Sequence, residues 1–534
     1  MSNTTDRIAR FLDSPYLARV VPHLTPETLH EIVRYRGLDA CGELVTSATP
    51  AQLTSLLDLD LWRHTQPGHD ERFDVDRFGE WLEVLVETGD SVAARTVAAL
   101  DPQLVVVGLS RYLRVFDPGT FEPTESSDDE AIERHDKMNS ETRGDGPECE
   151  VGGYLLRARR NDAWDAIVSL LLVLETEHPH CFHALMEGCR RLSNSTPEID
   201  GLDDLLLAPE QHLHDAAIER EQRRSRQGYA TPADARAFLR MARQPRPMRD
   251  AIGINPIAIA YFRETQADGP AAPTADVPTS VASVLGLLAE AGLLRQGAGG
   301  AAGMPEGPRG LLGAGDEDAE AAKLPILRRL MAFVLHHDDT AYLTRSGELA
   351  FLANTLLAGS SIQGRPFTPR EASDAAAAVC NLGLEQSGAP IPDAFLVDHD
   401  LVTAFEAGWA ALHRDVSLFV ADRLVSTLAD LQCLDDDVRR DLHALERALV
   451  KQREAGTPWL ARDAAEVLAM LDMTAWIGVL GLLDECPVLP AALTAVLDGR
   501  TTAVSPTAFE FISTTAQIGD IRVFMRMLPG LLSS

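Results

Sequence analysis

The chain has 534 residues, of which 45% are hydrophobic and only 6% aromatic, and its formal net charge at pH 7 is −32. This length allows several domains, and the composition is that of a folded protein rich in helix-forming Ala and Leu, so we expect a mainly α fold. The acidic charge repels nucleic acids and anionic membranes, which excludes a general nucleic-acid-binding role unless a local basic patch overrides it.

Residues 1–118 are predicted to form an N-terminal array of short helices. Candidate N-caps recur about every 25 residues, at Thr25, Thr49, Asp74 and Asp101, and apolar residues follow helical spacing between them. Thr-Pro pairs at 231–232 and 368–369 predict further helix starts. A repeat of this length holds two short helices, which is typical of a superhelical, α-solenoid-like array.

Two phrases of this region, LTPETLHEIV and ATPAQLTSLL, resemble the repeats in the intracellular superhelical domain of MgtE-type magnesium transporters. The resemblance covers about a fifth of the chain. It implies a fold and carries no transport function, although it raises the possibility of a regulatory subunit for a membrane transporter.

Residues 119–150 are predicted to be an acidic, flexible segment. The stretch 121–150 holds eleven acidic residues against three basic ones and few apolar side chains, so it cannot offset its ordering entropy by burial. The flanking phrases at 111–116 and 151–159 alternate between apolar and polar residues. They predict a small β-hairpin that has the acidic segment as its long loop.

The next block, residues 151–265, is predicted to be helical and is unusual in its basic residues. It contains fifteen Arg and no Lys against sixteen acidic residues. Because the Arg guanidinium matches carboxylates and phosphates with a planar fork, one interpretation is a docking face for an acidic partner or a phosphorylated ligand. The alternative is pairing within the chain, with Glu219, Glu221, Asp234 or the acidic segment. The candidate partner-binding residues recur at helical spacing: Arg220, Arg223, Arg224, Arg236 and Arg240.

A dense set of coordinating side chains lies within the same block, at His178, His180, Cys181 and His183. Imidazole and thiolate are ligands of soft transition metals, and two of the histidines are one helical turn apart. The spacing is not that of a zinc finger, and the alternative is a polar corner between two helices.

Residues 266–322 are predicted to be a Gly/Ala/Pro-rich linker with one apolar helix, and residues 323–534 a C-terminal helical domain. His-Asp dipeptides recur along the chain, and adjacent His and Asp bind metal in helical phosphohydrolases. His337 and Asp338 are therefore a second candidate metal site, although an acidic chain also produces such pairs by chance. The dipeptides begin at His69, His135, His214, His337 and His399.

Longer phrases at 188–206, 227–239 and 351–385, together with N-terminal ones such as LARVVPHLTPETLH, resemble a bacterial family that is known only as a domain of unknown function. The resemblance spans most of the chain. It implies a recurring type of protein and brings no known activity, ligand or catalytic residue.

No catalytic residue is predicted, because nucleophile elbows, Walker loops, Rossmann fingerprints and HExxH are absent from the sequence. Scattered cysteines, an N-terminal segment without a signal-type apolar core and a longest apolar run of only about 14 residues lead us to expect a cytoplasmic protein that is not embedded in a membrane. The leading hypothesis is a helical binding or scaffold protein that contacts unidentified protein partners through helical grooves, without a cofactor. The alternative is a metal-dependent hydrolase with a His/Asp or His/Cys site, which would need a divalent metal.

Overall fold

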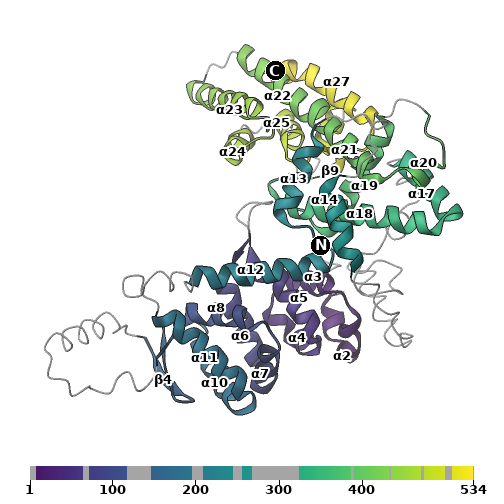
Figure 1. Ribbon diagram of the computed structural model, residues 1–534. Coiled ribbons are helices and arrows are strands. Elements are labelled where there is room, and N and C mark those ends of the chain that lie inside the picture. Colours follow the sequence, from purple (N-terminus) through teal and green to yellow (C-terminus); the bar gives the residue numbers. More distant parts are fainter. Residues whose placement is uncertain are drawn as a thin grey trace. The chain divides into compact units, whose positions relative to one another are not determined.

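The computed structural model describes residues 8–63, 71–116, 146–194, 209–244, 255–267, 324–386, 390–431, 435–470, 474–498 and 508–532. The chain is mainly α, as predicted, and short antiparallel strand pairs accompany the helices (Figure 1). It divides into two compact units. Unit 1 comprises residues 1–63, 71–224 and 272–296, and unit 2 comprises 64–70, 225–271 and 297–534.

The predicted segments map onto these units as follows. The Arg-rich block is distributed over both units, because the boundary falls at residue 224. The acidic segment lies outside the described residues except for 146–150, and the linker lies outside them except for 266–267. Among the described residues, no helix is both long and apolar enough to cross a membrane.

Unit 1 is built from short helices, two small sheets and a longer final helix, α12, whose last two residues fall in unit 2. Its elements are α2 (Leu17–Val20), η1 (Val21–His23), α3 (Pro26–Arg36), η2 (Asp39–Cys41), α4 (Gly42–Ser47), α5 (Pro50–Asp60), β1 (Trp62–Arg63), β2 (Arg72–Phe73), α6 (Val75–Glu87), α7 (Asp90–Ala98), α8 (Pro102–Tyr112), β3 (Leu113–Phe116), β4 (Glu148–Val151), β5 (Tyr154–Ala158), α10 (Trp164–Glu177), α11 (Pro179–Asn194) and α12 (Pro209–Arg226).

The helix starts predicted for unit 1 are confirmed. The Thr25 hydroxyl accepts a hydrogen bond from a first-turn amide of α3, and Thr49 forms a reciprocal capping box with Gln52 at the start of α5. The Asp74 and Asp101 carboxylates accept from first-turn amides of α6 and α8. Helix α3 packs on α5, α4 packs on α6, and α6 packs on α7. The superhelical path expected for residues 1–118 stays a prediction.

The predicted hairpin is also confirmed. Strand β3 pairs antiparallel with β5, so that Leu113 lies opposite Ala158. Strand β4 extends this sheet in the order β3-β5-β4, although its residues 148–150 were predicted to belong to the acidic segment. Gly152 and Gly153, both with positive φ, make the tight turn that returns the chain from β4 into β5.

Unit 2 is a larger helical body (Figure 1). Its elements are α13 (Pro232–Ala242), α14 (Pro256–Ala267), α17 (Pro325–His337), α18 (Asp339–Gly359), β6 (Ser361–Ile362), β7 (Arg365–Pro366), α19 (Pro369–Glu385), α20 (Phe395–Asp398), α21 (Leu401–Ala411), η5 (Leu412–Leu418), α22 (Phe419–Asp430), α23 (Asp436–Glu454), α24 (Arg462–Met470), α25 (Thr474–Leu480), η6 (Gly481–Leu483), β8 (Val488–Pro490), α26 (Ala491–Leu497), β9 (Phe509–Phe511) and α27 (Thr515–Leu532).

The centre of unit 2 is the contact between α19 and α21, which glycine makes possible. A Cβ atom on Gly383 would lie 1.8 Å from the carbonyl oxygen of Ala404, and one on Gly408 would lie 2.0 Å from that of Val379. Only residues without a side chain allow the two backbones to approach this closely. Helix α21 then continues into η5, a π-helical segment, before α22 begins. Such segments are rare and are frequent at functional sites.

Candidate functional site

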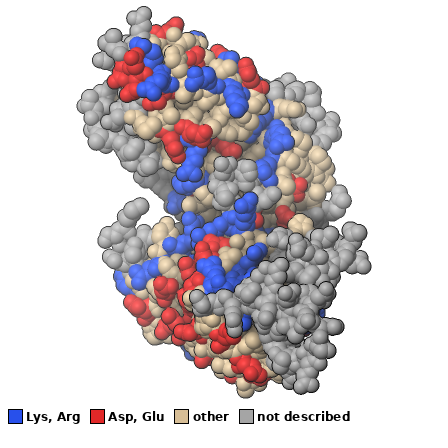
Figure 2. Space-filling model, turned by 90° about the vertical axis from the view of Figure 1, so that its left-hand side faces the viewer, with Lys and Arg blue, Asp and Glu red and all other residues tan. Residues whose placement is uncertain are grey.

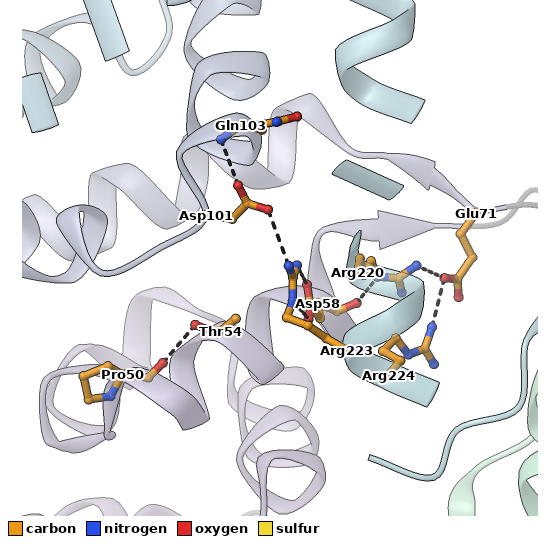
Figure 3. A network of polar contacts seen from close by, with 9 residues as sticks. All are labelled: Pro50, Thr54, Asp58, Glu71, Asp101, Gln103, Arg220, Arg223 and Arg224. Carbon is orange, nitrogen blue, oxygen red and sulfur yellow. Dashed lines mark hydrogen bonds and ion pairs between the residues drawn. The ribbon is translucent and has the colours of Figure 1, made fainter. Parts of the chain in front are cut away.

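Three arginines of α12 bind acidic residues that come from other parts of unit 1 (Figure 3). The Nε and Nη2 atoms of Arg223 both donate to the Asp58 carboxylate at 2.9 Å, and its Nη1 lies 3.4 Å from Asp101 Oδ2. These two bonds make the pair bidentate, with a buried Asp58 (2% exposed) and a half-buried Arg223 (24% exposed). The α12 arginine network is defined here as Asp58, Glu71, Asp101, Arg220, Arg223 and Arg224.

Arg220 is the most deeply buried arginine of this network, with a side chain that is 7% exposed. Its Nε donates to the carbonyl oxygen of Asp58 at 2.7 Å, and its guanidinium lies over the Trp62 ring, 4.9 Å from the centroid. Glu71 forms ion pairs with both Arg220 and Arg224, the latter at 3.1 Å. Burial, followed by the neighbouring charge of Arg224, lowers the pKa of Arg220 to about 10, so the group stays charged at neutral pH.

A second buried carboxylate, Asp60, lies on the same last turn of α5. It accepts hydrogen bonds from His30 at 3.2 Å, from Arg77 at 2.6 Å and from Trp81 at 2.7 Å. Burial alone would raise the pKa of Asp60, but these three donors hold it well below its usual range. Negative charge is unfavourable at a helix C-terminus, so the acids that end α5 need this compensation by cations and donors.

In the α12 arginine network, each of the three arginines already binds a carboxylate of unit 1, so the network connects parts of the same unit. Its guanidinium groups already bind carboxylates, and a partner would have to displace these acids before it could use them. Pairing within the chain therefore describes these three arginines, and the acids that they bind include Asp58, Glu71 and Asp101. Glu219, one of the acids considered, instead hydrogen-bonds Asp101, and that contact raises the pKa of Glu219.

The two remaining candidate arginines lie on α13, in unit 2. Arg236 donates from Nε to the carbonyl oxygen of Pro232 at 3.2 Å. Arg240 is exposed and forms no ion pair with another described residue. One turn further on, Arg243 lies over the ring of Trp459, with 3.9 Å from Cζ to the centroid. Arg243 follows the same helical spacing as the candidate arginines, but its contact with Trp459 was not predicted, because nothing in the sequence links two positions so far apart.

The surroundings of Arg243 contain further titratable groups, and together they form what we call the Arg243 cluster. Arg240, His413 and Glu485 each lie close enough to Arg243 to affect a pKa. Burial, and then the charge of Arg243, lowers the pKa of His413 to about 4, so this histidine is neutral at pH 7. The cluster is Arg240, Arg243, His413, Trp459 and Glu485.

Beside this cluster lies Asp484, a carboxylate with unusual surroundings. It accepts hydrogen bonds from the backbone amides of Gln363 and Glu485, and it forms no ion pair with a described residue. Burial raises the pKa of Asp484 to about 7, which the two amides only partly counteract. No sequence signal marks this residue, because its burial depends on the packing of η6 against distant elements.

The first predicted metal site is a turn between two helices. His178 ends α10, with its amide bonded to the carbonyl oxygen of Leu174 at 2.9 Å, and α11 begins at the next residue. His180 and His183 are exposed, and the His183 ring contacts that of Phe182 at 5.4 Å. Cys181 is half-buried, and this burial raises the pKa of its thiol.

The second predicted metal site is also a junction between two helices, α17 and α18. The His337 ring stacks on Phe333 at 3.9 Å, and its Nδ1 bonds the carbonyl oxygen of that residue at 2.7 Å. Asp338 caps α18 by accepting from the amide of Ala341 at 2.9 Å. Within the part of the chain that the structure describes, no group of three or more His, Cys, Asp or Glu could hold a metal ion. The geometry therefore lends no support to either metal site.

Surface charge in the described regions is mixed in sign. On the face drawn in Figure 2, Lys and Arg side chains lie among Asp and Glu side chains in both units. The large net negative charge of the chain thus coexists with local basic groups, of which Arg240 is one. Net charge by itself does not identify a binding surface on this protein.

In comparisons with known proteins, a family model matches only an N-terminal part of the chain. No curated protein and no solved structure matches it. The resemblance to MgtE-type transporters is not confirmed, and the phrases at 227–239 and 351–385 lie beyond the region that matches a family. Residues 1–198 match the model of a family described as "Family of unknown function (DUF6178)", which confirms the resemblance to an uncharacterised family over this N-terminal part of the chain.

Proposed function

We propose that this protein is a cytoplasmic helical binding protein that recognises a protein partner through the first helices of unit 1. The supporting observation is the exposure of two tyrosines there, Tyr35 at 62% and Tyr16 at 42%. Each lies beside an exposed arginine, Arg34 next to the first and Arg19 one turn after the second. Tyrosine and arginine carry much of the binding energy in protein interfaces.

Local charge supports a partner with an acidic surface. Residues 8–36 hold four arginines against three acidic residues, whereas the chain as a whole has 80 acidic and 48 basic residues. An acidic partner is thus attracted to this part of unit 1 and repelled by the rest of the chain. Six of the seven cysteines fall within the described residues and all six are free, which fits a reducing compartment.

Site-specific photo-cross-linking tests this proposal. A photoreactive phenylalanine analogue replaces Tyr35 or Tyr16 in the full chain, and we expect each to give a covalent adduct with the same protein in the native cells. A matched control carries the analogue at Leu343, which is 69% exposed and lies in unit 2. Adducts that are no stronger at the tyrosines than at Leu343 would contradict the proposal.

Purified partner then gives the quantitative test. We expect Tyr35→Ala to weaken its binding by about 2 kcal/mol, because a central interface tyrosine is a typical hot spot. Arg34→Gln is expected to lower the association rate and its dependence on salt. The alternative function, a metal-dependent hydrolase, has no observation among the described residues in its favour. Stoichiometric Zn, Fe or Mn in protein purified without a metal-affinity tag would revive it.

A further inference from the structure

Arg243 is a half-buried cation without an acidic partner among the described residues. Its guanidinium lies over the Trp459 ring, so the indole covers one side and leaves the N–H edge to bind another group. No hydrogen bond or ion pair joins this edge to a described residue. Taking a charge out of water without a partner is unfavourable, so an anion bound at this edge would offset the cost.

A second arginine strengthens the positive field at this point. Arg240 lies one turn before Arg243, which caps α13. Burial lowers the pKa of Arg243 most, Glu485 raises it, and the charge of Arg240 lowers it by less. Arg240 is exposed and likewise has no ion pair among the described residues. The C-terminal end of α13 favours cations, but the helix dipole stabilises each of them only weakly. The two charges therefore lack full compensation.

One neighbouring acid, Glu485, opposes this field, and its effect on the pKa of Arg243 exceeds that of Arg240. The Glu485 carboxylate accepts hydrogen bonds from the amide and the hydroxyl of Ser361, at 2.9 and 3.0 Å, and raises the pKa of Arg243 without a hydrogen bond to it. His413 belongs to the π-helical segment η5 and is neutral at pH 7. It can exchange hydrogen bonds with a ligand and adds no charge.

We propose that Arg243, supported by Trp459 and aided by Arg240, binds the carboxylate or phosphate group of a small ligand. The planar guanidinium fork matches two oxygens of either group, and Trp459 restricts its orientation, which lowers the entropic cost of binding. The site lies in unit 2 and is independent of the partner surface proposed for unit 1. Carboxylate and phosphate share this recognition chemistry, and the experiment distinguishes them.

Isothermal titration calorimetry on the full chain tests the site, with inorganic phosphate in one series and succinate in another. We expect saturable binding of at least one probe, and which probe binds identifies the preferred group. Arg243→Gln should weaken binding about tenfold or more, because a charged hydrogen-bond donor is lost. Arg243→Lys should have an intermediate effect, and Arg240→Gln should weaken binding about two- to threefold.

Two further variants control for indirect effects. Trp459→Leu keeps the charge of Arg243 but removes the surface under it, so it should weaken binding less than Arg243→Gln does. Arg370→Gln removes an exposed arginine elsewhere in unit 2 and should leave binding unchanged. If Arg243→Gln does not fold, Arg240→Gln and Trp459→Leu decide the result. No saturable binding of either probe, or equal affinities for wild type and these variants, would overturn the proposal.

Discussion

The arginines of α12 and those at the end of α13 come from one Arg-rich stretch of sequence but have opposite surroundings. On α12, Arg220 and Arg223 bind carboxylates and a carbonyl oxygen of unit 1 and are largely buried with them. On α13, Arg240 and Arg243 have no acidic partner among the described residues, and one of them rests on an indole ring.

This difference separates two uses of the same side chain. A guanidinium that already holds a carboxylate in a dry place fixes one element against another, and its removal leaves the carboxylate unmatched. A guanidinium that is half-buried without a partner contributes little to folding, and its donors remain available to a ligand. We therefore expect substitutions in the α12 arginine network to change stability and those in the Arg243 cluster to change binding.

The largest effect is expected from Asp58→Ala. This change leaves the half-buried Arg223 without its bidentate partner and with only the longer contact to Asp101, so unfolding should become easier by about 3 kcal/mol. Urea denaturation followed by circular dichroism measures the loss. Asp436→Ala is the matched control, because that carboxylate is 86% exposed and should change stability by less than about 0.5 kcal/mol. Equal, small losses for both variants would remove the distinction between the two sets of arginines.

The next largest effect is the dependence of stability on pH. It comes from two carboxylates whose pKa values are shifted in opposite directions. Asp484 has its pKa raised from 3.8 to about 7, so its native form binds a proton between these values while its unfolded form does not. Stability from this group is therefore complete below pH 4 and is lost as the pH rises towards 7, by about 1.4 kcal/mol for each pKa unit at most. Asp60 has a lowered pKa and acts in the other direction, losing its contribution as the pH falls below its usual range.

Substitution separates these two contributions. Asp484→Asn should remove the decline in stability between pH 4 and 7 and leave the acid-induced loss in place. Asp60→Asn should reduce the loss of stability at acid pH and leave the decline between pH 4 and 7 unchanged. Denaturant midpoints measured across pH 3–8 provide the comparison. A profile for Asp484→Asn that coincides with that of wild type would show that the pKa of this half-buried carboxylate is not raised.

Smaller losses of stability are expected from Arg220→Lys and Arg243→Lys, and the loss at position 220 should be the larger of the two. Lysine keeps the charge but lacks the fork and stacks poorly on an aromatic ring. At position 220 the change loses the bond from Nε to the Asp58 carbonyl oxygen and the contact with Trp62, so we expect a destabilisation of about 1–2 kcal/mol. At position 243 only the contact with Trp459 is lost, and about 0.5–1 kcal/mol is expected. Thermal unfolding of the two variants tests this order.

Local features of the fold could be predicted because neighbouring residues determine them. Capping by Thr49 and Thr368 depends on a side chain and the amide three residues later, and both capping boxes are present. The pairing of β3 with β5 followed from the alternation of the two phrases. Strand β4 was missed because its charged residues resemble those of the acidic segment before it.

The His-Asp dipeptides explain why the sequence suggested metal sites. His337 and His399 each stack on a phenylalanine four residues earlier and bond its carbonyl oxygen, while Asp338 and Asp400 cap the helices that follow. The dipeptide is thus a junction between two helices, with histidine completing one and aspartate starting the next. Residue types alone do not distinguish this use from metal binding. The ion pairs of the α12 arginine network could not be predicted either, because their acids are far from α12 in the sequence.

The smallest effect on stability is expected from Arg240→Gln. Its side chain is exposed and has no ion pair among the described residues, so we expect the free energy of unfolding to change by no more than about 0.5 kcal/mol. Because its charge lies near Arg243, removal should also relieve some of the repulsion between the two cations. Chemical denaturation of Arg240→Gln and of Arg223→Gln then compares the two regions directly, because only the second variant should lose much stability. A loss of several kcal/mol at position 240 would mean that this arginine, like those of α12, holds an acidic residue, and the two regions would no longer differ.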